Sequence, residues 1–178
     1  MTNKLSQMLS DTMAVITNPS VASFERLENK GTLQDAMLYV GLCALISGLF
    51  GLSGGVMGLL SGVLSTLVGF GVFTYLVHTV GKGQGGTGSL DQVAYTFSLF
   101  WVPLSVVGAV IALILTITII GIFLLPLVGI AMLLLQVMFA YLAVQSSMNL
   151  QAGKPATVTL VVAFLGTLVV KLVLSAIF

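Results

Sequence analysis

Charged residues are so rare along this chain that the gaps between them outline its architecture. Residues 36–81 and 92–153 contain no charged side chain, and residues 155–170 form a third uncharged stretch. Because a membrane-spanning helix needs about 20 apolar residues, the first stretch fits two spans joined by a turn near residues 51–55. The second stretch fits two long spans or three short ones, and residues 157–178 fit one.

The basic residues favour five spans. With five spans and a cytoplasmic N-terminus, the basic residues outside the spans all fall on the cytoplasmic side: Lys4, Arg26, Lys30, Lys82 and Lys154. Six spans would move Lys154 to the outer side. We therefore predict an all-α integral membrane protein with its C-terminus outside. A cytoplasmic segment, residues 1–31, would precede a membrane domain, residues 32–178, with spans at residues 34–52, 56–80, 92–115, 122–148 and 157–178.

Before the first span, the pattern predicts two short helices. In the first, apolar residues recur every three or four positions (Leu5, Met8, Leu9, Met13 and Ile16), and polar residues, Asp11 among them, take the other side. Asn18 and Pro19 fit the cap and first position of a second helix, which Gly31 would close. This amphipathic segment is either a docking surface for a cytoplasmic partner or an interfacial anchor for the first span.

Two short motifs predict the starts of membrane helices. Thr32-Leu33-Gln34-Asp35 reads as a capping box at the beginning of the first span. Ser89-Leu90-Asp91-Gln92 is expected to cap the helix of the third span.

Composition narrows the class of protein. Hydrophobic residues make up 58% of the 178 residues, charged residues only 6%, and the mean hydropathy is +1.18. Soluble domains carry about 25% charged residues, so a soluble enzyme, a disordered chain and a nucleic-acid-binding domain are excluded. The net charge of +1 indicates no polyanionic partner. The single cysteine, Cys43, cannot form an intrachain disulfide.

Catalytic motifs are matched only in part. Gly51-Leu52-Ser53-Gly54 resembles the serine motif of intramembrane proteases, but the only histidine, His78, would lie roughly 37 Å away along the second span. Gly81-Lys82-Gly83-Gln84-Gly85-Gly86 matches a dinucleotide fingerprint, yet it follows a membrane span rather than a strand. We therefore predict a non-enzymatic protein without a cofactor or a metal.

Three polar residues remain candidates for a function. Lys171 is the one charge inside a span, and it either has a function or extends to the outer interface. His78 and Asp91, with Asp35, lie near the cytoplasmic mouth of the bundle. Because these three residues lack the spacing of metal ligands, we interpret Asp35 and Asp91 as helix caps and His78 as an interfacial residue, rather than as a metal or proton site.

Small residues line one side of the second predicted span. Gly54, Gly58 and Gly62 recur every four residues, and Ser61, Ser65 and Gly69 form a second stripe beside them. Small residues at this spacing allow close approach of helices within a bilayer. The stripes fit packing within the chain, and they also fit a seam with a second copy or another membrane protein.

Several segments resemble the Yip domain (Ypt/Rab-interacting protein) membrane family, in its prokaryotic branch. They are Ile16-Thr17-Asn18-Pro19 through Phe24-Glu25-Arg26-Leu27, then Gly85-Gly86-Thr87-Gly88-Ser89-Leu90 with Tyr95 and Pro103, and Gln145-Ser146-Ser147-Met148-Asn149. The resemblance implies five spans, a cytoplasmic N-terminus and a prokaryotic cytoplasmic membrane. Eukaryotic members are scaffolds that bind Rab GTPases, but their Asp-Leu-Tyr-Gly-Pro motif is missing here, so Rab binding is not implied.

Two functions follow from these observations. The first is a scaffold that sits in the lipid bilayer and acts by helix-mediated assembly, as a homo-oligomer or with other membrane or cytoplasmic proteins. The second is a small transporter or lipid-handling protein, with a cavity shaped by helix kinks at Pro103 and Pro126 and with Lys171 or His78 facing the path.

Overall fold

The computed structural model describes residues 2–51 and 54–177, so Leu52 and Ser53 of the serine motif lie outside the described residues. Within these ranges the chain forms seven helices. They are α1 (Thr2–Thr17), α2 (Val21–Glu25), α3 (Leu33–Gly51), α4 (Gly55–Gly83), α5 (Leu90–Thr116), α6 (Ile119–Met148) and α7 (Lys154–Ile177).

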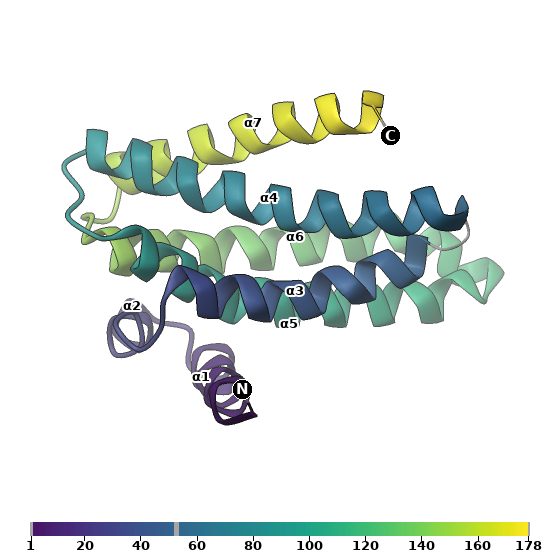
Figure 1. Ribbon diagram of the computed structural model, residues 1–178, viewed down its shortest axis with the longest axis horizontal. Helices are drawn as coiled ribbons and strands as arrows, with labels where there is room; N and C mark the ends of the chain where they lie inside the picture. The colour runs from purple at the N-terminus through teal and green to yellow at the C-terminus, as the bar shows by residue number, and fades with distance from the viewer. Residues whose placement is uncertain (1, 52–53, 178) are drawn as a thin grey trace.

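The five long helices form a bundle, and the two short helices lie across one end of it (Figure 1). Each of α3 to α7 is long and apolar enough to cross a membrane. Helix α3 packs on α4 and α5, α4 packs on α7, and α5 packs on α6, whereas α6 and α7 touch each other much less. This architecture confirms the predicted all-α fold with five candidate spans.

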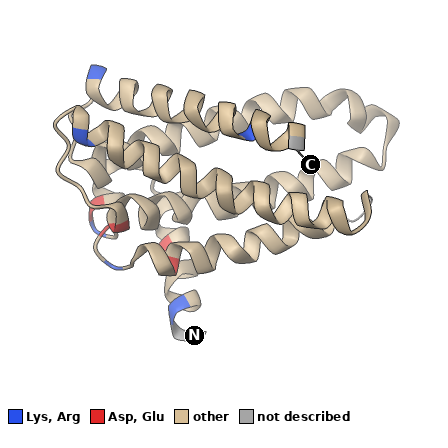
Figure 2. Cartoon of the chain, turned by 45° about the horizontal axis from the view of Figure 1, so that its top comes forward, with Lys and Arg blue, Asp and Glu red and all other residues tan. Residues whose placement is uncertain are grey.

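The two ends of the bundle differ in charge. Acidic and basic residues gather at the end that carries α1 and α2, and one basic residue of α7 lies far from them (Figure 2). We call the end that carries α1 and α2 the charged end. It also contains the α4–α5 connection, residues 84–89, and the α6–α7 connection, residues 149–153. The opposite, apolar end contains the α3–α4 and α5–α6 connections.

Helix α1 buries a different face from the one predicted. Asp11 and Thr12 are buried together with Met8 and Val15, whereas Leu9 and Met13 are exposed. The assignment of Asp11 to the polar, solvent-facing side was therefore wrong. Its burial is possible because side chains of α5 and of residue 30 bind its carboxylate.

The start of α2 also differs from the prediction. Ser20, not Asn18, caps the helix, and its hydroxyl accepts a hydrogen bond from the Ser23 amide at 3.2 Å. The amide of Asn18 still bonds to the Ala14 carbonyl at the end of α1, so Asn18 cannot also serve as the extended cap of α2. Helix α2 ends at Glu25, well before Gly31, so Gly31 does not close it.

Both predicted helix caps are present, and the one at Ser89 is a capping box as well. The Asp35 amide donates to Thr32 Oγ1 at 3.3 Å, and Asp35 Oδ2 accepts from the Thr32 amide at 3.0 Å. At α5, the Gln92 amide donates to Ser89 Oγ, and Gln92 Oε1 accepts from the Ser89 amide at 2.7 Å. Both boxes depend on residues three positions apart, which is why the sequence revealed them.

An aromatic cluster fills the middle of the bundle. Trp101 packs on Phe70 and Phe73, and its ring centroid lies 5.8 and 5.7 Å from theirs. Phe97 and Phe100 extend the cluster toward α6.

Candidate functional site

Asp11 joins α1 to the bundle. Its Oδ2 accepts a 2.7 Å hydrogen bond from the Tyr95 hydroxyl of α5, and its Oδ1 accepts from Lys30 Nζ at 3.3 Å. The neighbouring Thr12 hydroxyl donates to the Leu99 carbonyl at 3.1 Å and lies 3.2 Å from the hydroxyl of Tyr39. These contacts hold α1 against both α3 and α5.

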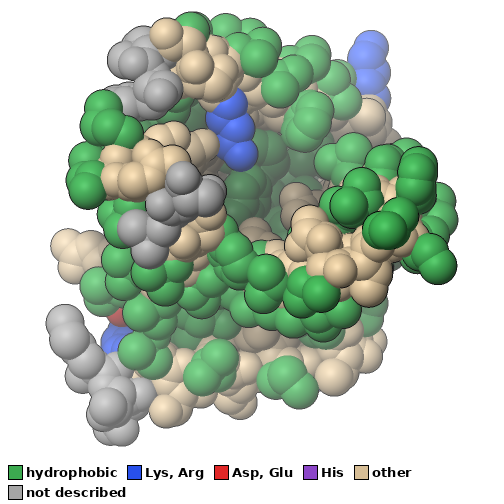
Figure 3. All heavy atoms as spheres, turned by 90° about the vertical axis from the view of Figure 1, so that its right-hand side faces the viewer, with side chains coloured by type: hydrophobic (Ala, Val, Ile, Leu, Met, Phe, Trp, Pro, Cys, Tyr) green, Lys and Arg blue, Asp and Glu red, His purple; other side chains and the backbone are tan. Residues whose placement is uncertain are grey.

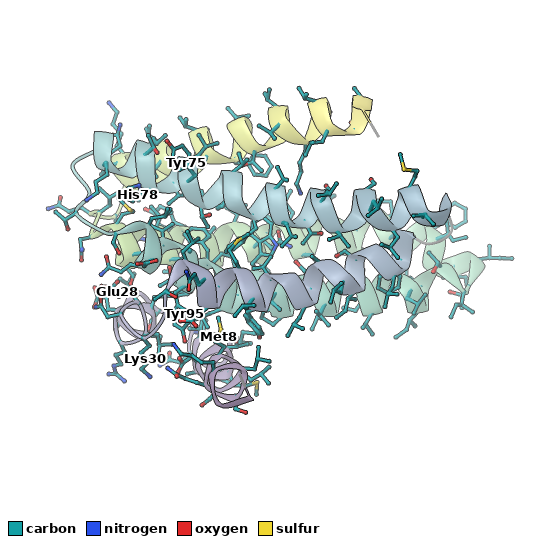
Figure 4. All side chains as sticks on the ribbon, viewed as in Figure 1. Met8, Glu28, Lys30, Tyr75, His78 and Tyr95 are labelled. Carbon is teal, nitrogen blue, oxygen red and sulfur yellow. The ribbon has the colours of Figure 1, made fainter. Side chains whose placement is uncertain are left out.

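Glu28 joins the segment after α2 to α5 and α6. Its carboxylate is buried and accepts hydrogen bonds from Ser146 Oγ at 2.8 Å and from Gln92 Nε2 at 3.3 Å (Figure 4). Burial raises the pKa of this carboxyl; the Ser146 hydrogen bond opposes that effect, and the charge of Glu25 adds to it. We refer to Asp11, Glu28, Lys30, Gln92, Tyr95 and Ser146 as the junction cluster.

Sequence reasoning overlooked Glu28. The signal in the sequence is its position four residues after the apolar Phe24, a residue that the structure shows to be fully buried. Residues four apart share one face of a helix or a helical turn, so burial of Phe24 brings Glu28 toward the bundle.

The α4–α5 connection packs closely against the end of α6, and at Gly88 the two backbones are in direct contact. A Cβ on Gly88 would overlap the carbonyl oxygen of Ser147, so only glycine fits there. The Thr87 amide donates to the Met148 carbonyl at 3.0 Å, and Asn149 Nδ2 donates to Thr87 Oγ1 at 3.0 Å. Two of the segments that carry the family resemblance are therefore in direct contact.

Gly31 is a second glycine at a close contact, here with Tyr95 of α5. A Cβ at Gly31 would overlap the ring of Tyr95. The chain after α2 can reach the Thr32 cap of α3 along this path only because residue 31 lacks a side chain.

The polar residues suggested as a small site are spread over separate contacts. Asp91 Oδ1 accepts from the Leu33 amide at 2.7 Å, and Asp35 pairs with Lys4 at 2.9 Å. His78 lies half-buried on α4 near Tyr75 (Figure 4). Among the described residues, no three His, Cys, Asp or Glu side chains are placed to hold a metal ion.

The glycine stripe of α4 meets several neighbours. A Cβ on Gly58 would overlap the carbonyl oxygen of Gly51, and one on Gly62 would lie 2.8 Å from the carbonyl oxygen of Ser47. These two glycines therefore pack α4 on α3. Gly54 has open space, and Gly69 faces α7.

Lys171 borders a cavity between α4, α5, α6 and α7. The cavity has a volume of about 440 Å³ and is lined mostly by apolar side chains, among them Phe73, Phe100, Trp101 and Phe164. Figure 3 shows the hollow from the apolar end, with a basic side chain on its wall. Among the described residues, the ion pairs are Lys4–Asp35 and Lys30–Asp11, so Lys171 has no carboxylate partner there.

A second, smaller cavity of about 70 Å³ lies on the other side of Lys171. It is lined by the serines Ser61, Ser65 and Ser175 together with Leu64 and Leu174. A Cβ on Gly69 would lie 2.8 Å from Lys171 Cε and 3.5 Å from its Nζ, so the lysine side chain rests on α4 at this glycine.

Comparison with known proteins gives one match. The Yip1 domain family matches residues 13–174, which include α2 to α6, nearly all of α7 and the whole junction cluster except Asp11. No curated protein and no solved structure matches the chain.

Proposed function

Since the chain belongs to the Yip1 domain family, we propose that it is a non-enzymatic multi-pass membrane protein whose charged end assembles with other membrane or cytoplasmic proteins. The observation that carries this proposal is the attachment of α1 and α2 to the bundle through Asp11 and Glu28. These contacts make the charged end a preformed surface.

The contacts of four of the five acidic side chains, all except the exposed Glu25, support a structural role over a catalytic one. Asp11 and Glu28 accept hydrogen bonds from the chain's own side chains, and Asp91 accepts one from a backbone amide. Asp35 caps α3 and pairs with Lys4. A general acid or base needs a carboxylate that can reach a substrate, whereas these four stabilise the fold.

The placement of basic residues supports a cytoplasmic charged end. The basic residues of this end lie on α1, after α2, at the end of α4 and at the start of α7: Lys4, Arg26, Lys30, Lys82 and Lys154. Cytoplasmic segments of membrane proteins are enriched in Lys and Arg. In this orientation α1 and α2 face the cytoplasm, and the C-terminus lies outside.

Because the glycine stripe already packs within the chain, we place the proposed assembly at the charged end. Gly58 and Gly62 are already used in the contact of α4 with α3. Exposed polar residues at the charged end, such as Arg26 and Gln84, remain available for a partner.

Cysteine cross-linking in native membranes tests this proposal. In a Cys43→Ala background, Arg26→Cys places a thiol on the charged end, and Phe123→Cys places a control thiol at the apolar end, where Phe123 is 81% exposed. We expect a maleimide–diazirine cross-linker, whose photoreactive end needs no cysteine on the partner, to give a product of defined mass with Arg26→Cys alone. Equal products from both variants, or none from Arg26→Cys, would contradict assembly through the charged end.

The Lys171 cavity favours lipid handling as a second candidate function. Its volume of about 440 Å³ lies within the range of small-molecule sites, roughly 300–1,000 Å³. Extraction of the protein from membranes in a mild detergent, followed by native mass spectrometry, would reveal a retained lipid if the protein has this role.

A further inference from the structure

We propose that the Lys171 cavity binds an anionic phospholipid of the surrounding bilayer, with one acyl chain in the apolar cavity and the phosphate at Lys171. This inference gives a ligand class to the second candidate function, and it does not depend on assembly through the charged end.

The shape of the cavity fits an acyl chain. On α7 its lining extends from Leu160 to Lys171, and eleven residues of helix rise about 16 Å. The walls are aromatic and aliphatic except at Gln136, Thr167 and Lys171, so a hydrocarbon chain would be in a mostly apolar environment along this length.

The cavity is open toward the bilayer between α6 and α7. These two helices contact each other little, because α7 packs mainly on α4 and α6 on α5. Leu133 and Val137 of α6, and Phe164 and Leu168 of α7, line the cavity and are 44–46% exposed. A lipid can enter sideways through this gap, and its second acyl chain can stay in the bilayer.

Lys171 supplies the charge complementarity. Within the described chain no carboxylate pairs with it, although an isolated ammonium is costly within the hydrocarbon region. Its side chain rests against Gly69 on α4, between the apolar cavity and the small cavity lined by serines. A phosphate in this position would neutralise the ammonium.

The serines give the headgroup further donors. Ser61 and Ser65 of α4, and Ser175 of α7, lie around the small cavity next to Lys171. The Ser175 hydroxyl already donates to the Leu172 carbonyl at 2.9 Å, which leaves the Ser61 and Ser65 hydroxyls to donate to phosphate oxygens. Hydrogen bonds to charged groups are stronger than those between neutral groups. The apolar cavity, Lys171 and the serines thus follow one another in the order of chain, phosphate and headgroup.

Trp101 provides a direct readout. It is the only tryptophan of the chain, and it lines the cavity. The full-length protein is reconstituted into phosphatidylcholine vesicles that contain a small fraction of phosphatidylglycerol, with bromine on the acyl chains of one lipid at a time. Brominated chains quench tryptophan fluorescence at short range, so the quenching per mole of lipid reports which lipid occupies the cavity.

We expect brominated phosphatidylglycerol to quench Trp101 about tenfold more per mole than brominated phosphatidylcholine, as a charge-assisted hydrogen bond predicts. Lys171→Met keeps an unbranched side chain that is one atom shorter and uncharged, and it should abolish this preference. Lys171→Arg should retain it. The control Lys154→Met removes a basic residue at the start of α7, outside the cavity, and should leave the preference unchanged.

Three results would overturn the proposal. The first is equal quenching by both lipids in the unmodified protein. The second is an unchanged preference in Lys171→Met, with circular dichroism showing that the variant remains helical. The third is Lys171-dependent quenching by a brominated fatty acid but not by phosphatidylglycerol, which would assign the site to a different amphiphile. Because quenching does not report on oligomers, its failure is distinct from a failure of the cross-linking experiment.

Discussion

The hydroxyl of Tyr95 donates a 2.7 Å hydrogen bond to Asp11, a residue 84 positions earlier in the chain. Both side chains are buried, so this contact replaces water for the carboxylate of Asp11. It explains how a charged residue of α1 can face the bundle rather than solvent. Together with the Thr12–Leu99 and Gln92–Glu28 hydrogen bonds, it fixes the position of the N-terminal segment on α5.

Tyr95→Phe should loosen α1 without emptying the core, because the ring that contacts Gly31 is retained. Loss of a hydrogen bond to a buried carboxylate costs about 1–3 kcal/mol. We expect a lower unfolding temperature and faster amide hydrogen exchange across α1. Tyr75→Phe is the matched control, since Tyr75 is 60% exposed on α4. Wild-type exchange rates in α1 of the Tyr95→Phe variant would show that this hydrogen bond does not hold the helix.

Glu28 should make stability depend on pH in a defined direction. Its pKa is raised in the folded protein above the usual value of 4.5, so the unfolded chain loses the proton first as pH rises. The contribution of Glu28 to stability therefore falls from pH 4.5 up to its folded pKa, and it stays lower above that pH.

The variant Glu28→Gln should lack this decline. A glutamine retains an acceptor for Gln92 and provides a donor to Ser146, so the contacts survive without the charge. Thermal unfolding in detergent from pH 4 to 8 would measure the difference in unfolding temperature between the wild-type protein and Glu28→Gln. A difference in unfolding temperature that stays the same from pH 4 to 8 would contradict the prediction. Glu28→Ala should be destabilised at every pH, by about 1–3 kcal/mol for each partner left unpaired.

Gly88→Ala should be among the most damaging small substitutions in the chain. The added methyl group would overlap the Ser147 carbonyl oxygen, so either the α4–α5 connection or the end of α6 must move. Overpacking of this kind costs about 1–3 kcal/mol or more. Gly83→Ala is the control, because its Cβ would meet no atom within 4 Å. Comparable unfolding temperatures for the two variants would show that this contact is not rigid.

Local signals made much of the fold predictable. The uncharged stretches indicated long apolar helices, and the helix caps at Thr32 and Ser89 were visible because both members of each pair lie three residues apart. The cap of α2 was misassigned within the run Asn18-Pro19-Ser20, where two residues are good caps. The hydrogen bond of Asn18 to the end of α1 decides between them, and the sequence pattern does not contain it.

The candidate sites were harder to predict because their contacts are distant in sequence. Glu28 meets Ser146 over a separation of 118 residues, and no periodic pattern indicates such a pair. Lys171 was identified as the one charge inside a predicted span, but its position between two cavities depends on how α7 packs on α4 and stays apart from α6. Helix positions follow from local pattern, whereas cavities arise from the packing of several helices.

The orientation of the chain can be tested separately from its function. With the charged end in the cytoplasm and five spans, a reporter fused after Phe178 should read as external, and one fused before Met1 should read as cytoplasmic. A cytoplasmic signal from the C-terminal fusion would contradict either the number of spans or the proposed direction of insertion. Fusions after residue 84 would then distinguish these two explanations.

Gly58→Ala should separate packing within the chain from assembly. The methyl group would overlap the Gly51 carbonyl oxygen, so we expect the α3–α4 hairpin to open and the unfolding temperature to fall. Gly71→Ala, also in α4, is the control, because its Cβ would meet no atom within 4 Å. If Gly58 also formed a seam with a second copy, Gly58→Ala would change the oligomeric mass in native mass spectrometry at temperatures where the fold is intact. An unchanged mass together with a lower unfolding temperature is the result that this packing predicts.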